Sequence, residues 1–355
     1  MECVLAVEGG NTKTVALVAA LDGTILGTGR GGCGDIYYSR AFARGMDGTA
    51  LALENIEGAV SQALSVARIE RGDLVASVFN MAGADWPEDF ALLRSAMQER
   101  GLGRIIQVQN DALGILHTGS SDNTGVSIIC GTGAATGARG PDGRVWHSSF
   151  WQGTAEGSVQ LSRKTLDAVM RSELGIEPPT TLTRHVLAFF GLPTVEEVLH
   201  RLTGRNQPDL PRIDGLTPVL LDEADAGDIL AQQIIREHGH ALGKYGVVAA
   251  RKVGIEGTAF ALVLAGGVLR HPSPLLAEAI VAEVCLTSPD VKPVRTRGEP
   301  AIGVLLTALE MAGIHLNKDI LAQIAMTTPP ADFFATLPAS SFRESIETLP
   351  YPVQP

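Results

Sequence analysis

A short turn near the start of the chain carries the groups from which a phosphate site is built. The segment Glu8–Thr12 lies between two apolar runs, which predicts a β-hairpin with this segment as its turn. Gly9 and Gly10 let the backbone approach a ligand closely, and the Glu8 carboxylate suits a hydrated Mg²⁺. Backbone N–H groups and donor side chains together suit a phosphate, although a plain hairpin turn with a solvated lysine is the alternative. The donor side chains are those of Asn11, Thr12 and Lys13.

A second turn of similar composition follows the strand predicted for residues 125–130. Gly131, Thr132 and Gly133 form it, and a strand, an Asp-Gly turn and a third strand come after it. This order repeats that of residues 3–29, which indicates an internal duplication of architecture. We expect the two hairpin turns to face each other across a cleft and to hold one polyphosphate from both sides.

Asp111 is the candidate for acid–base chemistry. It follows the strand predicted for residues 105–109, at the join between the duplicated halves. A carboxylate there could take the proton of a substrate hydroxyl that attacks a γ-phosphate. The alternative is that Asn110 and Asp111 cap the helix predicted for residues 112–117.

Two further segments could contact a ligand. Glu156 precedes a helix and could bind sugar hydroxyls, or it could be a first-turn carboxylate that the helix dipole favours. Gly266 and Gly267 end a predicted strand and would let an adenine or a ribose lie flat against the backbone. An ordinary strand-to-helix turn is the alternative for these two glycines. All these loops follow strands, where open α/β sheets bind ligands.

The elements that position these loops are those of an α/β protein. Hydrophobic periodicity and turn residues predict a strand at 74–80 and another at 259–264, and a mostly helical region over 157–252. The tail 327–355 is expected to wrap the surface or to be poorly ordered. The other predicted helices are 41–69 with a break near 45–48, 85–100, 273–285 and 300–311, and a short strand is predicted at 291–294.

Composition restricts the class of function. The chain has 355 residues, which suits two domains, and its net charge is −11 with a pI near 5.2. Such an acidic chain is a poor candidate for binding nucleic acid or an anionic membrane. The four cysteines show no CxxC spacing, which favours reduced thiols in a cytoplasmic protein. There is no leader-like start and no apolar run of about 18 residues, and neither the P-loop nor the dinucleotide fingerprint is present.

Taken together, the motifs resemble those of the BadF/BadG/BcrA/BcrD ATPase family, to which N-acetylglucosamine kinases belong. The resemblance covers about residues 3–313. It implies the actin/sugar-kinase fold, with two ribonuclease-H-like domains at 1–113 and 114–315, a helical insertion at about 157–253, and an extension at 316–355. The motifs that carry it are Gly-Gly-Asn-Thr-Lys-Thr from Gly9, Asn-Asp-Ala from Asn110, Cys-Gly-Thr-Gly from Cys130, Glu-Gly-Ser from Glu156 and Ala-Gly-Gly-Val from Ala265.

The resemblance also implies roles for these residues. The turns at Gly9–Lys13 and Gly131–Gly133 would hold the phosphates of ATP-Mg²⁺, with Glu8 near the metal. Asp111 would be the base for a sugar hydroxyl, and Gly266–Gly267 would lie against the adenosine. The residues expected to line the sugar pocket are Asp35, Tyr37, Gly83, Asn110, Thr132 and Glu156.

Three positions depart from the family pattern. Glu8 stands where the family usually has Asp, and a longer carboxylate could still hold the metal through water. Ala155 stands where the family motif has an Asp that contacts the amino sugar, which leaves the identity of the sugar open. Asp35 stands about where the amino-sugar kinases have an Asn, so the pocket is expected to be rebuilt.

Three functions follow as hypotheses. The first is an ATP-dependent kinase of a sugar or amino sugar, with a small-molecule sugar as the expected partner and a homodimer as the expected assembly. The second is a non-catalytic nucleotide or sugar sensor, which the alanine at position 155 motivates. The third is the ATPase that activates a radical dehydratase, whose subunits share an iron–sulfur cluster; no cysteine of this chain is placed for one.

Overall fold

The computed structural model describes residues 1–39, 47–153, 155–205 and 213–335. The chain divides into two compact units. The first consists of Met1–Asn123 together with the segment that begins at Gly298, and the second consists of Thr124–Arg297. In the part of the chain that the structure describes, no helix combines the length and apolarity needed to cross a lipid bilayer.

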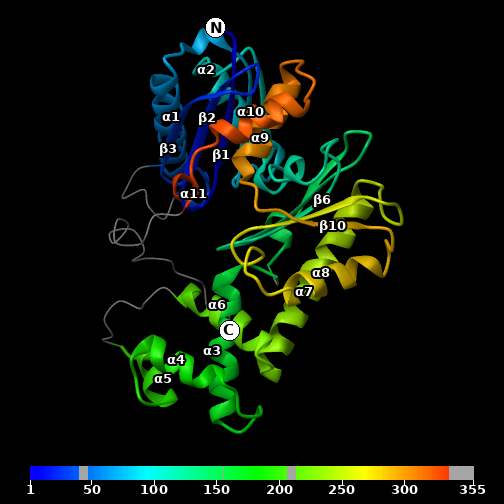
Figure 1. The fold of residues 1–355 in the computed structure, drawn as a ribbon. Helices are drawn as coiled ribbons and strands as arrows, with labels where there is room; N and C mark the ends of the chain where they lie inside the picture. Colours follow the sequence, from blue (N-terminus) through cyan, green and yellow to red (C-terminus); the bar gives the residue numbers. More distant parts are fainter. Residues whose placement is uncertain (40–46, 154, 206–212, 336–355) are drawn as a thin grey trace. The chain divides into compact units, whose positions relative to one another are not determined.

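The first unit is built on a five-stranded sheet with the order β3-β2-β1-β4-β5. The first three strands are antiparallel neighbours, and β4 and β5 run parallel to β1. The predicted opening hairpin is therefore confirmed (Figure 1). The strands are β1 (Cys3–Gly9), β2 (Thr14–Ala20), β3 (Ile25–Gly31), β4 (Leu74–Met81) and β5 (Ile105–Asn110).

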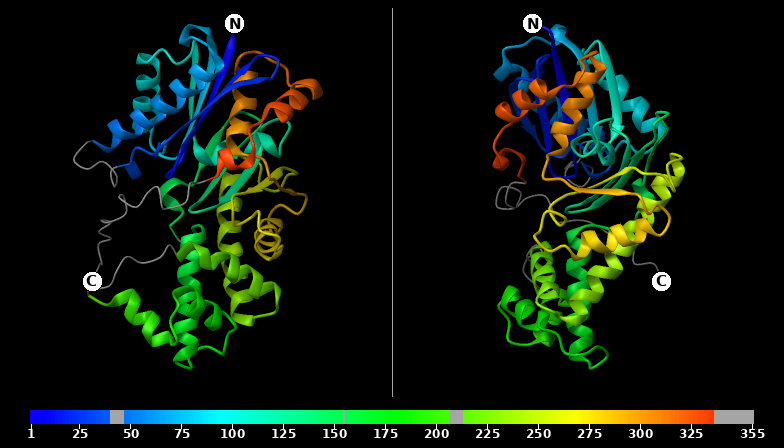
Figure 2. Two further views of the ribbon diagram at one scale, coloured as in Figure 1. Left: turned by 60° about the vertical axis from the view of Figure 1, so that its left-hand side comes forward. Right: turned by 45° about the vertical axis from the view of Figure 1, so that its right-hand side comes forward.

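Both faces of this sheet are buried, which explains why its strands are almost continuously apolar. Alternate residues of β1 point to opposite faces. Leu5 and Val7 pack with the helices α1 (Gly48–Ala67) and α2 (Pro87–Glu99) on one face. Val4 and Ala6 pack with α9 (Pro300–Met311) and α10 (Lys318–Thr327) on the other (Figure 2).

Glycines of β3 allow α1 to lie directly against the sheet. A Cβ atom at Gly29 would lie 1.9 Å from the carbonyl oxygen of Ala59 on α1. The flanking glycines of the strand, Gly27 and Gly31, would meet α1 backbone oxygens at 2.1 Å. Since the obstruction is helix backbone, no side chain can rotate to relieve it.

We predict that Gly29→Ala destabilises the protein by about 3 kcal/mol, because α1 must move away from β3. The measurement is the denaturant midpoint of the purified protein. The matched control is Gly58→Ala on α1, where a Cβ meets no described atom within 4 Å. Higher helix propensity should make that variant about 0.5–1 kcal/mol more stable. Equal midpoints for the two variants would contradict the prediction.

The second unit repeats the sheet of the first. Its order is β8-β7-β6-β9-β10, with β6, β7 and β8 antiparallel and with β9 and β10 parallel to β6. Strand for strand, this is the arrangement of the first unit, so the α/β class and the predicted duplication are confirmed. The strands are β6 (Gly125–Cys130), β7 (Ala134–Arg139), β8 (Val145–His147), β9 (Ala261–Ala265) and β10 (Lys292–Arg295).

A helical region lies between β8 and β9, as the sequence predicts (Figure 1). The long helix α7 packs against both α8 and β7. Its contact with α8 is close because Gly239 and Gly243 face α8 backbone atoms. The helices are α3 (Ser158–Glu173), α4 (Leu182–Phe190), α5 (Val195–Thr203), α6 (Leu216–Asp225), α7 (Ile229–Lys252) and, after β9, α8 (Leu275–Cys285).

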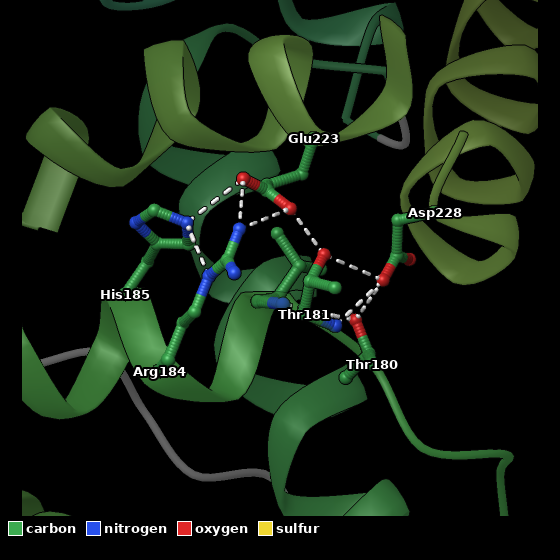
Figure 3. A network of polar contacts seen from close by, with 7 residues as sticks. Thr180, Thr181, Arg184, His185, Glu223 and Asp228 are labelled. Atoms are coloured by element: carbon green, nitrogen blue, oxygen red, sulfur yellow. Dashed lines mark hydrogen bonds and ion pairs between the residues drawn. The ribbon is translucent and has the colours of Figure 1, made fainter. Parts of the chain in front are cut away.

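Two carboxylates hold the start of α4 against α6 and α7 (Figure 3). Glu223 of α6 accepts hydrogen bonds from Thr181 and Arg184 and lies 2.8 Å from Nε2 of His185. Asp228, the N-cap of α7, accepts from the hydroxyl group of Thr180 and the N–H of Thr181, both at 2.7 Å. The network therefore joins three helices, with the buried Glu223 and the half-buried Asp228 as its acceptors.

Glu223→Gln should destabilise the protein by about 2 kcal/mol, because the amide cannot accept at both atoms and faces its –NH₂ toward other donors. The hydrogen bond from Thr181 is the main cause that holds the pKa of Glu223 below its ordinary value of 4.5. This stability is fully present above pH 4.5 and is lost as the pH falls through the lowered pKa. Thermal unfolding between pH 3 and 7 measures it, with the exposed Glu173→Gln as control. If the unfolding temperatures of Glu223→Gln and wild type differ by as much at pH 3 as at pH 7, the prediction is wrong.

Three features differ from the sequence-based expectations. The units divide near residues 123 and 298 and not at 113 and 315, because α9 packs on β1 and β4 of the first sheet. The helix expected at 112–117 is wrong: two short 3₁₀ turns, Asp111–Leu113 and Leu116–Thr118, stand there. The content of Pro, Gly and Asp in residues 204–217 predicts a loop, but α6 already begins at Leu216. Residues 40–46 and 336–355, where a helix start and the tail were expected, lie outside the described residues.

Candidate active site

The opening turn of the first unit is closely packed by backbone on both sides. The N–H of Gly10 donates to the carbonyl of Lys13 at 2.9 Å, which closes the turn. The carbonyl of Gly9 accepts from Ala82 N–H at 2.8 Å, and that of Gly10 accepts from Gly34 N–H at 3.0 Å. A Cβ at Gly9 would lie 2.3 Å from Cε of Met81, so the end of that flexible side chain would have to move. The turn therefore sits beside the loops that follow β3 and β4.

Lys13 reaches the C-terminal segment of the same unit. Its ammonium donates a hydrogen bond to the carbonyl oxygen of Phe334, in the short helix α11 (Ala331–Phe334). Arg30 donates to the carbonyls of Phe333 and Ala335, each at 2.8 Å, and lies over the Phe333 ring. The chain after Pro330 is thus held against the opening hairpin as far as Ala335, a wrapping that the sequence predicts. Thr12 is half-buried and Asn11 is exposed beside this contact.

Asp111 lies just after β5 and is half-buried. The side chain of Asn110 accepts from Ala112 N–H at 3.1 Å, so Asn110 is the cap that the alternative interpretation describes. Asn80 of β4 donates to the carbonyl of Asp111 at 3.2 Å. Asn110 is therefore the capping residue of this turn.

The carboxyl group of Asp111 lies among other carboxylates of the first unit. Burial raises the pKa of Asp111 to about 7, and the charges of Asp85, Asp35 and Glu8 raise it further in the same direction. A base whose pKa lies near the working pH transfers protons most efficiently. The structure thus brings four carboxylates of the first unit near one another, two of which are the predicted metal and base residues.

The residues predicted for a sugar pocket lie close to this group. Asp35 is buried, and its Oδ1 atom accepts from the N–H groups of Tyr37 and Tyr38 at 2.7 and 3.0 Å. A Cβ at Gly83 would lie 2.9 Å from that same Oδ1 atom. The Tyr37 hydroxyl group donates to Asp89, and burial with this bond raises the pKa of Tyr37 to about 12. Tyr37 is therefore fixed in position at the start of α2.

In the second unit, the Gly131–Gly133 turn is backed by the segment that begins α3. Ser158 N–H donates to the carbonyl of Gly131 at 2.8 Å. A Cβ at Gly157 would lie 2.3–2.5 Å from the carbonyl oxygens of Gly131, Thr132 and Gly133. Because C=O and N–H point in opposite directions in a trans peptide, the N–H groups of Thr132 and Gly133 point away from Gly157. Successive N–H groups directed to one side form a concavity that binds anions.

The second predicted glycine pair lies beside this turn. Gly266 has a φ of +99°, and a Cβ there would lie 2.4 Å from the carbonyl oxygen of Cys130. Val268 N–H donates to that oxygen at 3.0 Å. The exposed Gly267 follows at the end of β9. The parallel pairing of β6 with β9 therefore places both glycine turns at one edge of the sheet.

Glu156 and Ala155 lie between β8 and α3. Glu156 is exposed, and its N–H donates to the Oε1 atom of Gln160 at 3.0 Å. Ala155 is fully buried in the hydrophobic core of the second unit. A carboxylate at position 155 would therefore be removed from water, at a cost that a methyl group does not carry.

Residues 5–308 match the BadF/BadG/BcrA/BcrD ATPase family. The chain belongs to this family. The resemblance seen in the motifs is therefore confirmed over most of the chain, and ATP is confirmed as the nucleotide of the family.

One curated protein and two solved structures are similar to this chain. The N-acetylmuramic acid/N-acetylglucosamine kinase of Clostridium acetobutylicum is 25% identical over 312 residues, covering 87% of this chain and 98% of that protein. A structure from Porphyromonas gingivalis, provisionally described as an N-acetylglucosamine kinase, has a TM-score of 0.60 at 17% identity and covers 86% of this chain and 99% of its own. The ROK family glucokinase of Streptomyces griseus, solved with glucose and AMPPNP, has a TM-score of 0.51 at 18% identity, with coverages of 87% and 99%. The likeness to the two solved structures confirms the predicted sugar-kinase fold.

Within this BadF/BadG/BcrA/BcrD family member, each unit brings together the residues predicted for it. The first unit gathers the opening turn, the Asp35 loop, Gly83 and Asp111, and the second gathers both glycine turns and Glu156. Sequence reasoning missed Asp89, Asn80 and Gly157 as supporting residues. Asp89 could have been noticed as a first-turn carboxylate after Pro87, and Asn80 as a polar residue in a buried strand.

Metal-binding groups are sparse in the described ranges. No group of three or more His, Cys, Asp or Glu side chains there could hold a metal ion. Mg²⁺ in phosphate-binding sites needs only one or two protein carboxylates, since phosphates and water complete its shell. Glu8, the residue predicted to lie near the metal, is one such carboxylate. Cys3, Cys33 and Cys130 are buried, so none of these three thiols is exposed for a shared cluster.

Proposed function

We propose that this protein is an ATP-dependent kinase that phosphorylates a hydroxyl group of an amino sugar, with Asp111 as the general base. The observation that carries the proposal is the grouping of Asp35, Asp85 and Glu8 around Asp111 beside the opening turn, where burial and these charges raise the pKa of Asp111 to about 7. Family membership and the curated N-acetylmuramic acid/N-acetylglucosamine kinase relative support the reaction class.

Asp111 would accept the proton of the sugar hydroxyl as that oxygen attacks the γ-phosphate of ATP. Loss of the proton increases the negative charge on the attacking oxygen, and positioning of the two substrates lowers the entropy cost of their encounter. Asn80 and Asn110 fix the backbone on either side of the base, since one binds the Asp111 carbonyl and the other caps the next turn.

Backbone N–H groups would bind the phosphates. The Gly131–Gly133 turn directs those of Thr132 and Gly133 to one side, and the opening turn of the first unit carries Asn11 and Thr12. Glu8 would hold Mg²⁺ through water, and the ion when bound neutralises charge on the transferred phosphoryl group. Lys13 donates to Phe334, so its share in phosphate binding requires that it exchange this partner.

The proposed substrate is an amino sugar of the N-acetylglucosamine or N-acetylmuramic acid class. Its pocket would use the Asp35 loop, Gly83 and Asn110 of the first unit. Ala155 is buried and offers no carboxylate, so discrimination among amino sugars must come from the other pocket residues.

A substrate panel tests the proposal. The protein is incubated with ATP, Mg²⁺ and, separately, N-acetylmuramic acid, N-acetylglucosamine, glucosamine, N-acetylmannosamine and glucose, and ADP release is followed. We expect turnover with at least one N-acetylated amino sugar and less with glucose. ADP at the sugar-free background with every sugar would overturn the proposal. Calorimetric binding of ATP without turnover would identify the alternative, a nucleotide sensor.

A further inference from the structure

A buried histidine and a half-buried lysine form a pair in the second unit that takes no part in the chemistry described above. His238 lies on α7 with no exposed surface, and Lys164 lies on α3. Nε2 of His238 is 2.8 Å from the carbonyl oxygen of Glu156, and Nδ1 is 3.2 Å from Nζ of Lys164. Because a carbonyl oxygen can only accept, Nε2 carries the ring proton, and Nδ1 accepts from the lysine ammonium.

The electrostatics agree with a neutral ring. Burial is the main cause that lowers the pKa of His238 to about 4, and the nearby charge of Lys164 lowers it further. Burial also lowers the pKa of Lys164. A neutral imidazole that donates at one nitrogen and accepts at the other has a single tautomer, which fixes its orientation.

The Glu156 carbonyl links this pair to the phosphate turn. The same oxygen accepts from the thiol of Cys130, 3.9 Å away at the end of β6. The next two residues, Gly157 and Ser158, contact the carbonyl side of the Gly131–Gly133 turn. A continuous series of contacts therefore runs from Lys164 through His238 and Glu156 to that turn.

We infer that Lys164 and His238 are positioning residues that hold the Glu156–Ser158 segment against the Gly131–Gly133 turn. The effect that this positioning has on catalysis rests on the proposed function. Without the His238 bond the half-buried Glu156 carbonyl keeps only a weak thiol donor, so we expect the segment to shift. Such a move displaces Gly157 and Ser158, which contact the turn, together with the backbone of Glu156. Binding of both phosphate and sugar should weaken, with a smaller change in kcat.

Four variants separate positioning from general stability. His238→Leu removes both hydrogen bonds, whereas His238→Gln can place an amide N–H near the position of Nε2–H. Lys164→Met removes the ammonium and keeps the length of the side chain. His240→Gln is the matched control, two residues further along α7 and exposed.

Two measurements are independent of catalysis. Hydrogen exchange at Ser158 N–H reports the bond to Gly131, and calorimetry with a non-hydrolysable ATP analogue reports phosphate binding. We expect His238→Leu to accelerate this exchange and to raise the Kd of the analogue, each about tenfold. His238→Gln should bring both the exchange rate and the Kd most of the way back to wild type. Lys164→Met should give values between those of His238→Leu and wild type, and His240→Gln should match wild type. In the kinase assay, His238→Leu should raise both KM values more than it lowers kcat.

Unchanged exchange at Ser158 in a folded His238→Leu protein would overturn the inference, and so would equal losses in the Gln and Leu variants. If His238→Leu does not fold, the ¹⁵N chemical shifts of the His238 ring in the wild-type protein test the inference instead. A proton on Nδ1 would overturn it, because Nε2 could then not donate to the Glu156 carbonyl. Absence of sugar phosphorylation in wild type would overturn the proposed function and leave the exchange experiment valid.

Discussion

Asp111→Asn is expected to lower kcat for sugar phosphorylation by about a thousandfold, within the range that a general base contributes. Asparagine has nearly the same shape as aspartate, so the 3₁₀ turn and the Asn80 bond remain. It cannot accept the substrate proton at neutral pH. The Kd of a non-hydrolysable ATP analogue, measured by calorimetry, should change little, because the variant removes a negative charge and no phosphate donor.

The pH dependence gives the same base a second test. Asp111 must be ionised to accept a proton, and its pKa is about 7. The kcat/KM for the sugar should therefore be constant above pH 7 and fall about tenfold per unit below it. Asp85→Asn removes a charge that raises this pKa, so it should move the midpoint to lower pH. A variant Asp111→Asn that keeps a tenth of kcat, or a profile flat from pH 5 to 9, would exclude Asp111 as the base.

Much of the fold follows from local patterns in the sequence. The apolar runs of β1 and β2 around a glycine turn define a hairpin, and the same order of signals at residues 125–146 defines its counterpart. Because both hairpins start sheets with the same strand order, recognising the duplication is enough to predict the topology. Local signals do not show which sheet a distant helix covers. Consequently α9, which lies far along the chain, was placed with the second domain although it packs on β1.

The candidate site was predictable where glycine or a carboxylate follows a strand, since parallel strands bring such residues to one edge. The supporting contacts were not predictable in this way. Lys13 meets Phe334 across more than 300 residues of sequence, and His238 meets Glu156 from a helix whose pattern indicates only burial. Such contacts depend on how elements pack, and no spacing rule encodes that packing. Oligomeric state stays a prediction for the same reason.

Gly157 shows how a single position supports the turn proposed to bind phosphate. Three consecutive carbonyl oxygens of the Gly131–Gly133 turn converge on it, and Ser158 N–H holds the first of them. Contact of this kind requires a residue without a side chain. The φ of Gly157 is −92°, outside the left-handed region that favours glycine, so the contact with these oxygens is the main obstacle to a side chain there.

Gly157→Ala should therefore weaken binding of a non-hydrolysable ATP analogue about a hundredfold, equivalent to about 2.7 kcal/mol. Its Cβ would lie 2.3–2.5 Å from backbone oxygens, so the turn itself must shift and its N–H groups lose their alignment. Calorimetry gives the affinity, and circular dichroism verifies the fold. Gly153→Ala in the same connection is the control, because a Cβ there meets no described atom within 4 Å. If Gly157→Ala binds the analogue as tightly as Gly153→Ala does, the Gly131–Gly133 turn does not hold the phosphates.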